Sequence, residues 1–270
     1  MLAGKVAVLT GASSGLGAAL ALALAEAGAT LALFATNSER LEGVAAQCRE
    51  RGAKVLAVTG DVTKAEDCQR LMQGAVRELG RIDYMIANAG ISMWARFEEL
   101  EDVEVFQRLI DVNYMGVVRC AHAALPHLKE RAGMVVVISS IQSKVPVPLH
   151  SGYVASKHAV QGFCDVLRLE LQGTGVDVLT VLPHWLRGTN LRQSALGGDG
   201  QALGETSRKH SSESITVEDA SVEIIRAMKK RQRQLVMPWK LKLLAAVYAL
   251  KPQWAEAVIG RAMNKQNDDK

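Results

Sequence analysis

The feature that most constrains this chain is a regular alternation of short apolar runs with longer segments of helical periodicity. The first pair is typical: the run KVAVLT at 5–10 ends at a glycine turn, and LGAALALALAEAG at 16–28 follows with the pattern of a helix. The runs are apolar throughout, which indicates strands that are buried on both faces. Strands that alternate with helices build a parallel sheet covered by helices on both sides.

The same alternation continues through most of the chain. We expect strands within 5–10, 30–35, 54–60, 82–90, 133–140, 175–183 and 234–238, and helices over 16–28, 38–52, 64–80, 103–131, 152–173 and 217–231. Ser38 is the predicted N-cap of the second helix, because its hydroxyl can accept a backbone N–H. No internal repeat or linker interrupts the pattern, so we predict one α/β domain over 1–238 with a doubly wound parallel sheet of about seven strands.

Two regions depart from the alternation. Residues 187–215 are polar and glycine-rich. A stretch of this length without secondary structure in a compact domain is usually functional or disordered, and we predict a substrate lid. Residues 239–270 form an extension, whose part at 239–263 is apolar with interspersed lysines and whose end is polar.

The apolar part of the extension has two interpretations. Trp239, Leu243, Val247 and Leu250 fall on one face of a helix. This helix could lie in a membrane surface with its lysines near the lipid headgroups. It could also pack against its own domain or a symmetry-related copy, which we favour because the helix is short and Pro252 breaks it.

Composition argues against several other classes of protein. The formal net charge is +4, which requires no nucleic-acid partner, and the basic run KKRQRQ at 229–234 has no aromatic side chain on which bases could stack. Cys48, Cys68, Cys120 and Cys164 lack the spacing of a metal site or a disulfide framework, so we expect no metal and a reducing, cytoplasmic location. The first apolar run is too short for a signal peptide, and no apolar run is long enough to span a bilayer.

The turn TGASSGLG at 10–17 joins the first predicted strand to the first helix. Its glycines, Gly11, Gly15 and Gly17, let backbone N–H groups approach a phosphate, and the helix N-terminus favours negative charge. An ordinary strand–helix connection could also contain these glycines. The position of the turn in the first βα unit of a doubly wound pattern favours a nucleotide site.

A candidate acid–base pair lies in the helix predicted for 152–173. Tyr153 and Lys157 are four residues apart, so both side chains share one face. A nearby ammonium group lowers the pKa of a phenol, and Tyr153 could then exchange a proton with a carbonyl or an alcohol, although a packed tyrosine beside a solvated lysine has the same spacing. Ser140 favours the catalytic interpretation, because it ends the fifth predicted strand at the edge where doubly wound folds bind ligands. Ser139 should point to the opposite face, since side chains alternate along a strand.

Together these motifs resemble the short-chain dehydrogenase/reductase family, in its single-domain branch. The glycine turn matches the T-G-x-x-x-G-x-G motif of the family in full, and Ser140 lies thirteen residues before Tyr153, as the catalytic serine of the family does. Further matches in the order of the family are Asp61 and Val62 after the third strand, Asn88, Ala89 and Gly90 after the fourth, and Asn113 in the long helix. The resemblance covers residues 4–238.

The resemblance implies a Rossmann-type fold and hydride transfer between a nicotinamide and a carbonyl carbon. Tyr153 would be the acid in reduction and the base in oxidation, Ser140 would polarise the substrate oxygen, and Lys157 would tune the tyrosine and bind the nicotinamide ribose. Asn113 would hold a water that connects Lys157 to solvent. The residues that the resemblance assigns to the cofactor are Gly11, Ser13, Ser14, Gly15, Leu16, Gly17, Asp61, Val62, Asn88, Ala89, Gly90, Tyr153, Lys157, Pro183 and Leu186.

The residues after the second predicted strand favour NADP over NAD. Proteins that bind NAD place an acid there to accept hydrogen bonds from the ribose 2′-hydroxyl, but the segment LFATNSER has no acid before Glu39. Thr36, Asn37 and Ser38 can donate hydrogen bonds to a 2′-phosphate. Arg40 can add positive charge. The basic residue that NADP-dependent members usually carry is absent, so NAD stays the alternative.

One segment departs from the family pattern. After the sixth strand the family has P-G-x-V-x-T, which contacts the nicotinamide amide, whereas this chain has PHWLRGT at 183–189. His184 replaces the glycine, and Thr189 comes one residue late, which leaves its role open. Leu186 could still supply the backbone contact. His184 and Trp185 could shape the substrate pocket, or His184 could be a surface histidine.

Loops at the carboxyl ends of the strands determine the substrate in such folds. The candidate pocket residues are Ser92, Trp94, Val145, His150, His184 and Trp185. Most are apolar or aromatic, so we expect an apolar ketone, aldehyde or alcohol, while arginines within 187–215 leave a phosphorylated or CoA-linked substrate open. The resemblance also implies a homodimer or homotetramer that buries the helices at 103–131 and 152–173.

Two other functions occur on this fold. A nucleotide-sensing protein without turnover should have lost part of the set formed by Asn113, Ser140, Tyr153 and Lys157, and all four are present. An isomerase or dehydratase of nucleotide sugars also uses Tyr-x-x-x-Lys, but it normally carries a longer C-terminal substrate domain.

Overall fold

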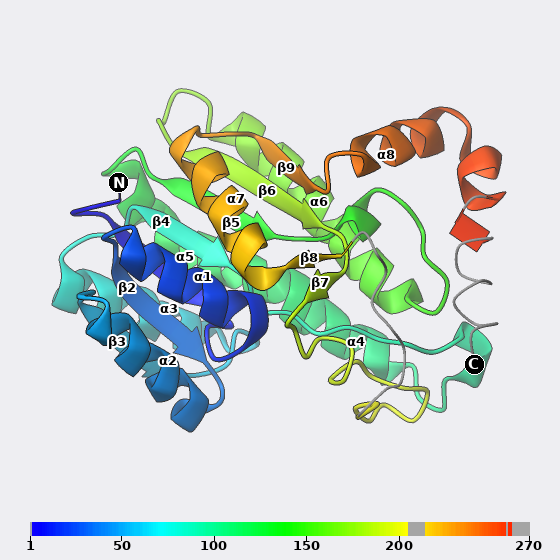
Figure 1. Cartoon of the computed structure of the whole chain (residues 1–270), viewed down its shortest axis with the longest axis horizontal. Coiled ribbons are helices and arrows are strands. Elements are labelled where there is room, and N and C mark those ends of the chain that lie inside the picture. Colours follow the sequence, from blue (N-terminus) through cyan, green and yellow to red (C-terminus); the bar gives the residue numbers. More distant parts are fainter. Residues whose placement is uncertain (1, 205–213, 258, 261–270) are drawn as a thin grey trace.

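The computed structural model describes residues 2–204, 214–257 and 259–260, and a parallel sheet of seven strands forms its centre (Figure 1). The strands are β1 (Val6–Thr10), β2 (Thr30–Ala35), β3 (Val55–Thr59), β4 (Tyr84–Ala87), β5 (Met134–Ile138), β6 (Asp177–Pro183) and β9 (Gln234–Met237). Their order is β3-β2-β1-β4-β5-β6-β9. The predicted doubly wound α/β fold is therefore confirmed.

Helices cover both faces of the sheet (Figure 1). One face carries α1 (Gly15–Glu26), α2 (Ser38–Glu50) and α7 (Val217–Lys229), and the other carries α3 (Ala65–Leu79), α5 (Gly116–Lys129) and α6 (Ser151–Glu170). Successive residues of a strand enter opposite cores: Leu9 packs in the core with α1, and Val8 packs in the core with α3 and α5. Burial on both faces explains why the strands are unbroken apolar runs.

The winding of the chain reverses at β1. This strand pairs with β2 on one side and with β4 on the other, and Leu9 lies opposite Ile86 of β4. The glycine turn after β1 and the loop after β4 therefore meet at the carboxyl edge of the sheet. Doubly wound folds bind their ligands at this reversal point.

The cap of α2 differs from the expectation. Asn37, not Ser38, is the N-cap, and its Oδ1 accepts the backbone N–H of Arg40 at 2.8 Å. Ser38 lies inside the helix. Asparagine and serine are about equally good N-caps. Which of the two adjacent residues caps α2 therefore depends on where the extended chain after β2 ends.

The helix predicted for 103–131 is interrupted. α4 (Glu104–Ile110) continues into a π-helical turn at Asp111–Met115, and α5 follows directly. A π turn inserts one extra residue and turns the side chains on either side of it relative to one another. Asn113 lies in this turn and is fully buried.

The segment after β6 has more structure than a featureless lid. β7 (Leu186–Arg187) pairs in parallel with β8 (Ile215–Thr216), and the buried Leu196 forms a bridge with Met93. Residues 205–213 of the predicted lid lie outside the described residues. A lid function stays a prediction.

The extension begins with α8 (Leu241–Leu250), which packs on the domain through one side only. Leu241 joins an apolar cluster beside β6 and β9. Trp239, Leu243 and Leu250 are exposed, so the favoured packing against the chain's own domain does not hold for them. Among the described residues, no helix combines the length and apolar character needed to cross a membrane. The division of the chain at residue 238 stays a prediction.

Candidate active site

The glycine turn after β1 is held by close main-chain contacts. Gly11 and Gly15 have φ of +64° and +52°, a region that glycine enters without strain. A Cβ on Gly17 would lie 2.0 Å from the carbonyl oxygen of Gly11 and 2.6 Å from Nδ2 of Asn88. Only a glycine therefore lets α1 start this close to the turn, with its N-terminal N–H groups facing the edge of the sheet.

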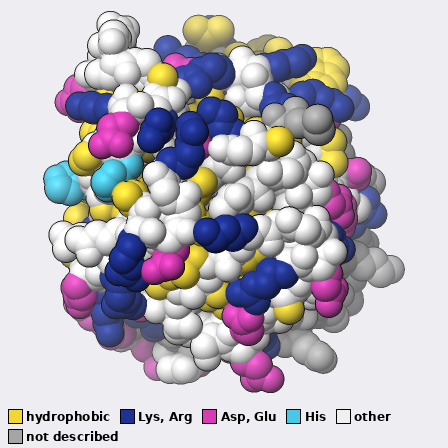
Figure 2. All heavy atoms as spheres, turned by 90° about the vertical axis from the view of Figure 1, so that its left-hand side faces the viewer, with side chains coloured by type: hydrophobic (Ala, Val, Ile, Leu, Met, Phe, Trp, Pro, Cys, Tyr) yellow, Lys and Arg dark blue, Asp and Glu magenta, His cyan; other side chains and the backbone are white. Residues whose placement is uncertain are grey.

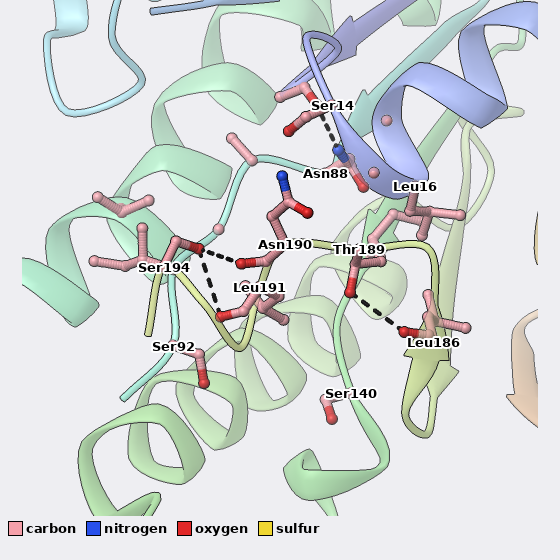
Figure 3. A pocket seen from close by; sticks show the side chains of 18 of the residues that line it. Ser14, Leu16, Asn88, Ser92, Ser140, Leu186, Thr189, Asn190, Leu191 and Ser194 are labelled. Carbon is pink, nitrogen blue, oxygen red and sulfur yellow. Dashed lines mark hydrogen bonds between the residues drawn. The ribbon is translucent and has the colours of Figure 1, made fainter. Parts of the chain in front are cut away.

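Asn88 fastens the loop after β4 to this turn. Its Nδ2 donates to the carbonyl oxygens of Thr10 and Gly11 at 3.0 and 3.1 Å, and its amide group points at the turn (Figure 3). The backbone N–H groups of Asn88 and Ala89 both donate to Oγ1 of Thr10, at 3.0 and 3.1 Å. These bonds fix two sides of the crevice relative to each other.

A cavity of about 480 Å³ runs along this edge from the glycine turn to Tyr153. Of the residues predicted to bind the cofactor, Gly11, Ser13, Ser14, Gly15, Leu16, Gly17, Thr36, Asp61, Val62, Asn88, Ala89, Gly90, Tyr153, Lys157, Pro183 and Leu186 line it. Of the predicted substrate residues, Ser92, His150, His184 and Trp185 line it, and so does Ser140. One continuous cavity thus joins a phosphate-binding turn to an acid–base pair, which suits an extended dinucleotide with a substrate at one end.

The part of the cavity near the end of β2 has little negative charge. Thr36 lines it there, and Asp61 is the one carboxylate among the described lining residues. Asn37, Ser38 and Arg40 are not part of the lining, and Oδ1 of Asn37 is occupied as the cap of α2. Thr36 is therefore the predicted phosphate donor that the cavity itself includes.

Ser140, Tyr153 and Lys157 come together at the other end of the cavity, and all three are buried. The Ser140 side chain acts on the Tyr153 phenol and lowers its pKa, although burial has the larger and opposite effect. Nζ of Lys157 lies 5.5 Å from the centroid of the Tyr153 ring and donates to the carbonyl oxygen of Ile138 at 3.2 Å. The two hydroxyls can hold one substrate oxygen between them.

A turn, not the alternation of a strand, positions Ser140. β5 ends at Ile138, and Oγ of Ser140 accepts the N–H of Gln142 at 3.2 Å (Ser140 is seen in Figure 3). Ser139 also lines the cavity, so alternation does not separate the two serines as expected. The Ser139 hydroxyl is buried with no hydrogen-bond partner among the described residues, and its structural role stays a prediction.

Burial dominates the ionisation of the pair. It raises the pKa of Tyr153 to about 12, against the opposing hydrogen bond with Ser140, and it lowers the pKa of Lys157 to about 8. The expectation that the pKa of Tyr153 is lowered is therefore wrong for the protein by itself, because the loss of water around the phenol raises this pKa by more than the interactions that favour the phenolate lower it. Tyr153 is a neutral proton donor at pH 7.

Asn113 uses its side chain to hold the loop after β4 and the start of α6. Its Oδ1 accepts the N–H of Ile91, and its Nδ2 donates to the carbonyl oxygen of Ile91, both at 2.9 Å. Nδ2 also donates to Oγ of Ser156, which in turn donates to the carbonyl oxygen of Tyr153. The Asn113 amide thus helps to position the backbone of Tyr153 through Ser156. Its role in holding a water stays a prediction.

The unusual segment after β6 still reaches the glycine turn. Thr189 lines the cavity, and its Cα would lie 3.5 Å from a Cβ on Gly15. Its Oγ1 donates to the carbonyl oxygen of Leu186 at 3.3 Å (Figure 3). The N–H of His184 donates to the carbonyl oxygen of Met237 at 2.8 Å, which ties the segment to the end of β9. The His184 side chain is half-buried in the cavity wall, not on the open surface.

Three aromatic rings and an arginine form the wall beside the acid. The ring of His150 lies 4.7 Å from Trp94 and 5.7 Å from Trp185, measured between centroids. The guanidinium of Arg192 stacks over both indoles, at 5.5 Å from Trp94 and 4.8 Å from Trp185. The centroids of His150 and Tyr153 are 6.2 Å apart. These rings are inclined to one another by 49° to 76° and form a largely aromatic surface next to Tyr153, from loops far apart in the sequence.

His150 is neutral at physiological pH. Burial lowers its pKa to about 4, and the positive charge of Arg192 lowers it further, against a hydrogen bond to Pro148 that raises it. Nδ1 lies 2.9 Å from the carbonyl oxygen of Pro148, and since a carbonyl only accepts, Nδ1 carries the proton. Nε2 is then an acceptor within the wall of the cavity.

Val145, which we expected in the substrate pocket, lies elsewhere. It is buried in the cluster with Ile141, Leu182 and Leu241, beneath α8. The 3-10 turn at Ile141–Ser143 interrupts the extended chain after β5. After this turn, the number of residues from the end of β5 does not predict which side chains face the cavity.

Several lining residues were not singled out from the sequence. They are Ile91, Val112, Gln142, Asn190, Leu191 and Ser194. Asn190 and Ser194 belong to a turn in which Oγ of Ser194 donates to the carbonyl oxygen of Asn190 at 2.9 Å (Figure 3). The polar composition of 187–215 marked this segment as functional, but it contains no motif that would identify individual residues.

The fold and these residues define an α/β protein with one cavity that extends from a glycine turn to Ser140, Tyr153 and Lys157. The family model for short chain dehydrogenase matches residues 5–197. The chain therefore belongs to the short-chain dehydrogenase family.

Curated relatives come from plants. The chain is 36% identical over 201 residues to 11-beta-hydroxysteroid dehydrogenase of Pinus massoniana, a match over 74% of this chain and 56% of the relative. It is 35% identical over 252 residues to 11-beta-hydroxysteroid dehydrogenase A of Sesamum indicum, over 88% of this chain and 72% of the relative. The chain thus spans little more than half the length of the Pinus relative.

Solved structures of similar proteins include two alcohol dehydrogenases. The alcohol dehydrogenase of the archaeon Thermococcus sibiricus, complexed with 5-hydroxy-NADP, has a TM-score of 0.73 and 32% identity, over 86% of this chain and 95% of that chain. A putative short-chain alcohol dehydrogenase of Sinorhizobium meliloti has a TM-score of 0.66 and 31% identity, over 69% of this chain and 74% of that chain.

Proposed function

We propose that this chain interconverts a ketone or aldehyde and the corresponding alcohol with a nicotinamide cofactor. The observation that carries the proposal is the continuity of one cavity, which has the glycine turn at one end and Ser140, Tyr153 and Lys157 at the other. When bound, the cofactor supplies or accepts the hydride, and the protein supplies position and protons.

Each residue of the acid–base centre has a separate task. Tyr153, neutral at pH 7, gives its proton to the carbonyl oxygen in reduction and takes it back in oxidation. Ser140, which lines the cavity together with Tyr153, orients and polarises the same oxygen. One N–H of Lys157 is directed at the carbonyl of Ile138, which anchors the ammonium at the end of β5, and its other donors are available for a ribose hydroxyl.

We propose NADP as the preferred cofactor, with NAD as the alternative. No carboxylate directly follows β2 in the lining, where the acid of NAD-binding proteins stands; Asp61, the acid in the described lining, follows the neighbouring strand β3. The start of α2 lies just beyond Thr36, and its N-terminal N–H groups favour an anion there. The similar alcohol dehydrogenase of Thermococcus sibiricus is complexed with a derivative of NADP.

We propose an apolar, flat substrate that carries a secondary alcohol or ketone. The wall formed by Trp94, His150 and Trp185 offers ring surfaces beside Tyr153. The names of the plant relatives, which are hydroxysteroid dehydrogenases, point to the same class of compound. The Arg192 guanidinium is stacked on the indoles and thus forms part of this wall.

Two further expectations concern the state of the protein. A homodimer or homotetramer would bury α5 and α6, and α6 presents the exposed apolar residues Val166 and Leu169 for such a contact. All four cysteines are free and buried, which fits the predicted reducing, cytoplasmic surroundings.

The test is a panel of ketones, aldehydes and alcohols assayed with NADPH or NADP and with NADH or NAD, followed at the absorbance of the reduced nicotinamide. We expect turnover of apolar secondary alcohols or ketones and tighter binding of NADPH than of NADH, measured by fluorescence titration. Tighter binding of NADH would overturn the cofactor preference. Binding of both cofactors without any turnover would favour a nucleotide-sensing protein.

A further inference from the structure

The outer surface of the extension is the most apolar exposed segment of the chain that the structure describes. Trp239, Leu243, Leu250 and Trp254 are 72%, 70%, 80% and 74% exposed. Leu243 and Leu250 are seven residues apart and therefore share a face of α8, with Trp239 four residues before the first of them. We call these four side chains the outer face. A contiguous exposed set of this kind marks a contact surface.

The outer face is distinct from the side of α8 that the fold needs. Leu241 is buried, and Leu244 and Tyr248 pack against Val236 and Ile141 beside it. This side holds α8 on the domain, and the four side chains of the outer face do not take part in that packing. Figure 1 places α8 at the end of the molecule remote from α2 and β3.

The charges around the outer face are mostly positive. Residues 239–256 contain three lysines, Lys240, Lys242 and Lys251, and one acid, Glu256, at the end of the segment. None of these lysines forms an ion pair within the described part of the chain, and all three are exposed. The face of the molecule in Figure 2 is different, because acidic and basic side chains are interspersed there.

The lysines distinguish between two occupants of the outer face. A second copy of the chain in a twofold contact would place the same surface against itself, and three lysines of each copy would then meet with only one glutamate per copy, Glu256, to offset them. An anionic lipid surface would instead accept the apolar side chains and attract every lysine.

We propose that the outer face docks the protein on the surface of membranes that contain anionic lipids. Trp239 and Trp254, one at each end, combine a large apolar ring with an N–H, as suits the headgroup level of a bilayer. α8 would lie along the membrane plane with Leu243 and Leu250 inserted and the three lysines among the headgroups.

An apolar groove connects this region with the loop that carries His150. Its lining includes Phe97, Pro146, Pro148, Leu149 and Ile259. Leu149 directly precedes His150, which belongs to the wall of the main cavity. The groove, whose lining also includes Glu256 from the segment after α8, and the main cavity are thus lined by adjacent residues of one loop.

The experiment is co-sedimentation of the full chain with vesicles of phosphatidylcholine alone and of phosphatidylcholine mixed with phosphatidylserine. We expect binding to the mixed vesicles, a blue shift of tryptophan fluorescence, and release at high salt. Replacing Lys240, Lys242 and Lys251 by glutamine should weaken binding by about fivefold for each lysine. The Leu243→Glu/Leu250→Glu variant should lose at least about tenfold in affinity.

The control is Val222→Glu, which adds a charge at an apolar residue of α7 that is 53% exposed and outside the outer face. It should bind the mixed vesicles as the unchanged protein does. Absence of binding to the mixed vesicles, or equal binding of the Leu243→Glu/Leu250→Glu variant, would overturn the proposal. The unchanged chain could fail to bind vesicles while the Leu243→Glu/Leu250→Glu variant shows a lower oligomer mass in light scattering. This result would assign the outer face to a contact between copies of the chain. The readout is independent of turnover, so it does not depend on the proposed reaction.

Discussion

The two ends of the cavity are built in different ways. The cofactor end is a main-chain structure, in which glycines let Gly11, Gly17 and the Asn88 loop approach within bonding distance. The substrate end is a side-chain structure, in which Trp94, Trp185 and Arg192 from separate loops stack on one another. A main-chain structure tolerates almost no change at a few positions, whereas a wall of side chains can be altered one residue at a time.

The largest effect on cofactor binding is expected where the main chain is closest. Gly17→Ala places a Cβ 2.0 Å from the carbonyl oxygen of Gly11, so the turn or α1 must move. We predict that the affinity for NADPH, measured by fluorescence titration, falls by roughly a hundredfold. Binding as tight as that of the unchanged protein would mean that the turn does not hold the nucleotide.

The next effect concerns the buried ammonium group. The pKa of Lys157 is lowered from 10.5 to about 8, so between these pH values the unfolded chain holds a proton that the folded chain does not. The free energy of unfolding should therefore rise with pH in this window because of Lys157, by a total of roughly 3 kcal/mol. Lys157→Met should lack this rise and be more stable at pH 7, as measured by urea unfolding at several pH values. An identical pH dependence in both proteins would show that burial does not govern this lysine.

A smaller effect is expected at the wall of side chains. Trp185→Ala removes the ring on which Arg192 stacks at 4.8 Å and which lies beside His150. We predict that KM for an apolar ketone rises by about tenfold and that the Kd for NADPH is unchanged. The matched control is Trp254→Ala, an exposed tryptophan outside the cavity, assayed with a water-soluble substrate. Weakened NADPH binding in Trp185→Ala would show that the two ends are not separable.

The smallest effect has the opposite sign. Gly43 lies inside α2 with no atom within 4 Å of a Cβ placed on it. Gly43→Ala should raise the free energy of unfolding by about 0.5–1 kcal/mol, because alanine loses less backbone freedom in a helix. Glycine-to-alanine substitution thus has opposite effects at the two kinds of position: it is harmful in the turn, at Gly17, and stabilising inside a helix, at Gly43. Destabilisation by Gly43→Ala in thermal unfolding would contradict this reading of α2.

The same contrast explains what the sequence could predict. A close main-chain approach demands glycine, and a buried parallel strand demands an unbroken apolar run, so both leave a pattern in the sequence. The sheet, the glycine turn and the Asn88 loop were predictable for this reason. Asn113 was singled out for its likeness to a motif, but the π turn that buries it has no signature in the apolar periodicity.

The substrate end could be predicted only in part. Trp94, His150 and Trp185 were chosen because they lie on loops at the correct edge, but the stack with Arg192 depends on how three loops pack together. Val145 was placed incorrectly because one 3-10 turn redirects the chain. The pKa values of Tyr153 and Lys157 follow from burial, which a pair of residues four positions apart does not reveal.

The most direct test of the central claim is Tyr153→Phe, which removes one hydroxyl from the buried centre. We predict that turnover at the nicotinamide absorbance falls by roughly a hundredfold to ten-thousandfold while the Kd for NADPH is unchanged. Tyr84→Phe, at the start of β4, is the matched control and should keep full turnover. Turnover by Tyr153→Phe close to that of the unchanged protein would contradict the assignment of Tyr153 as the proton donor.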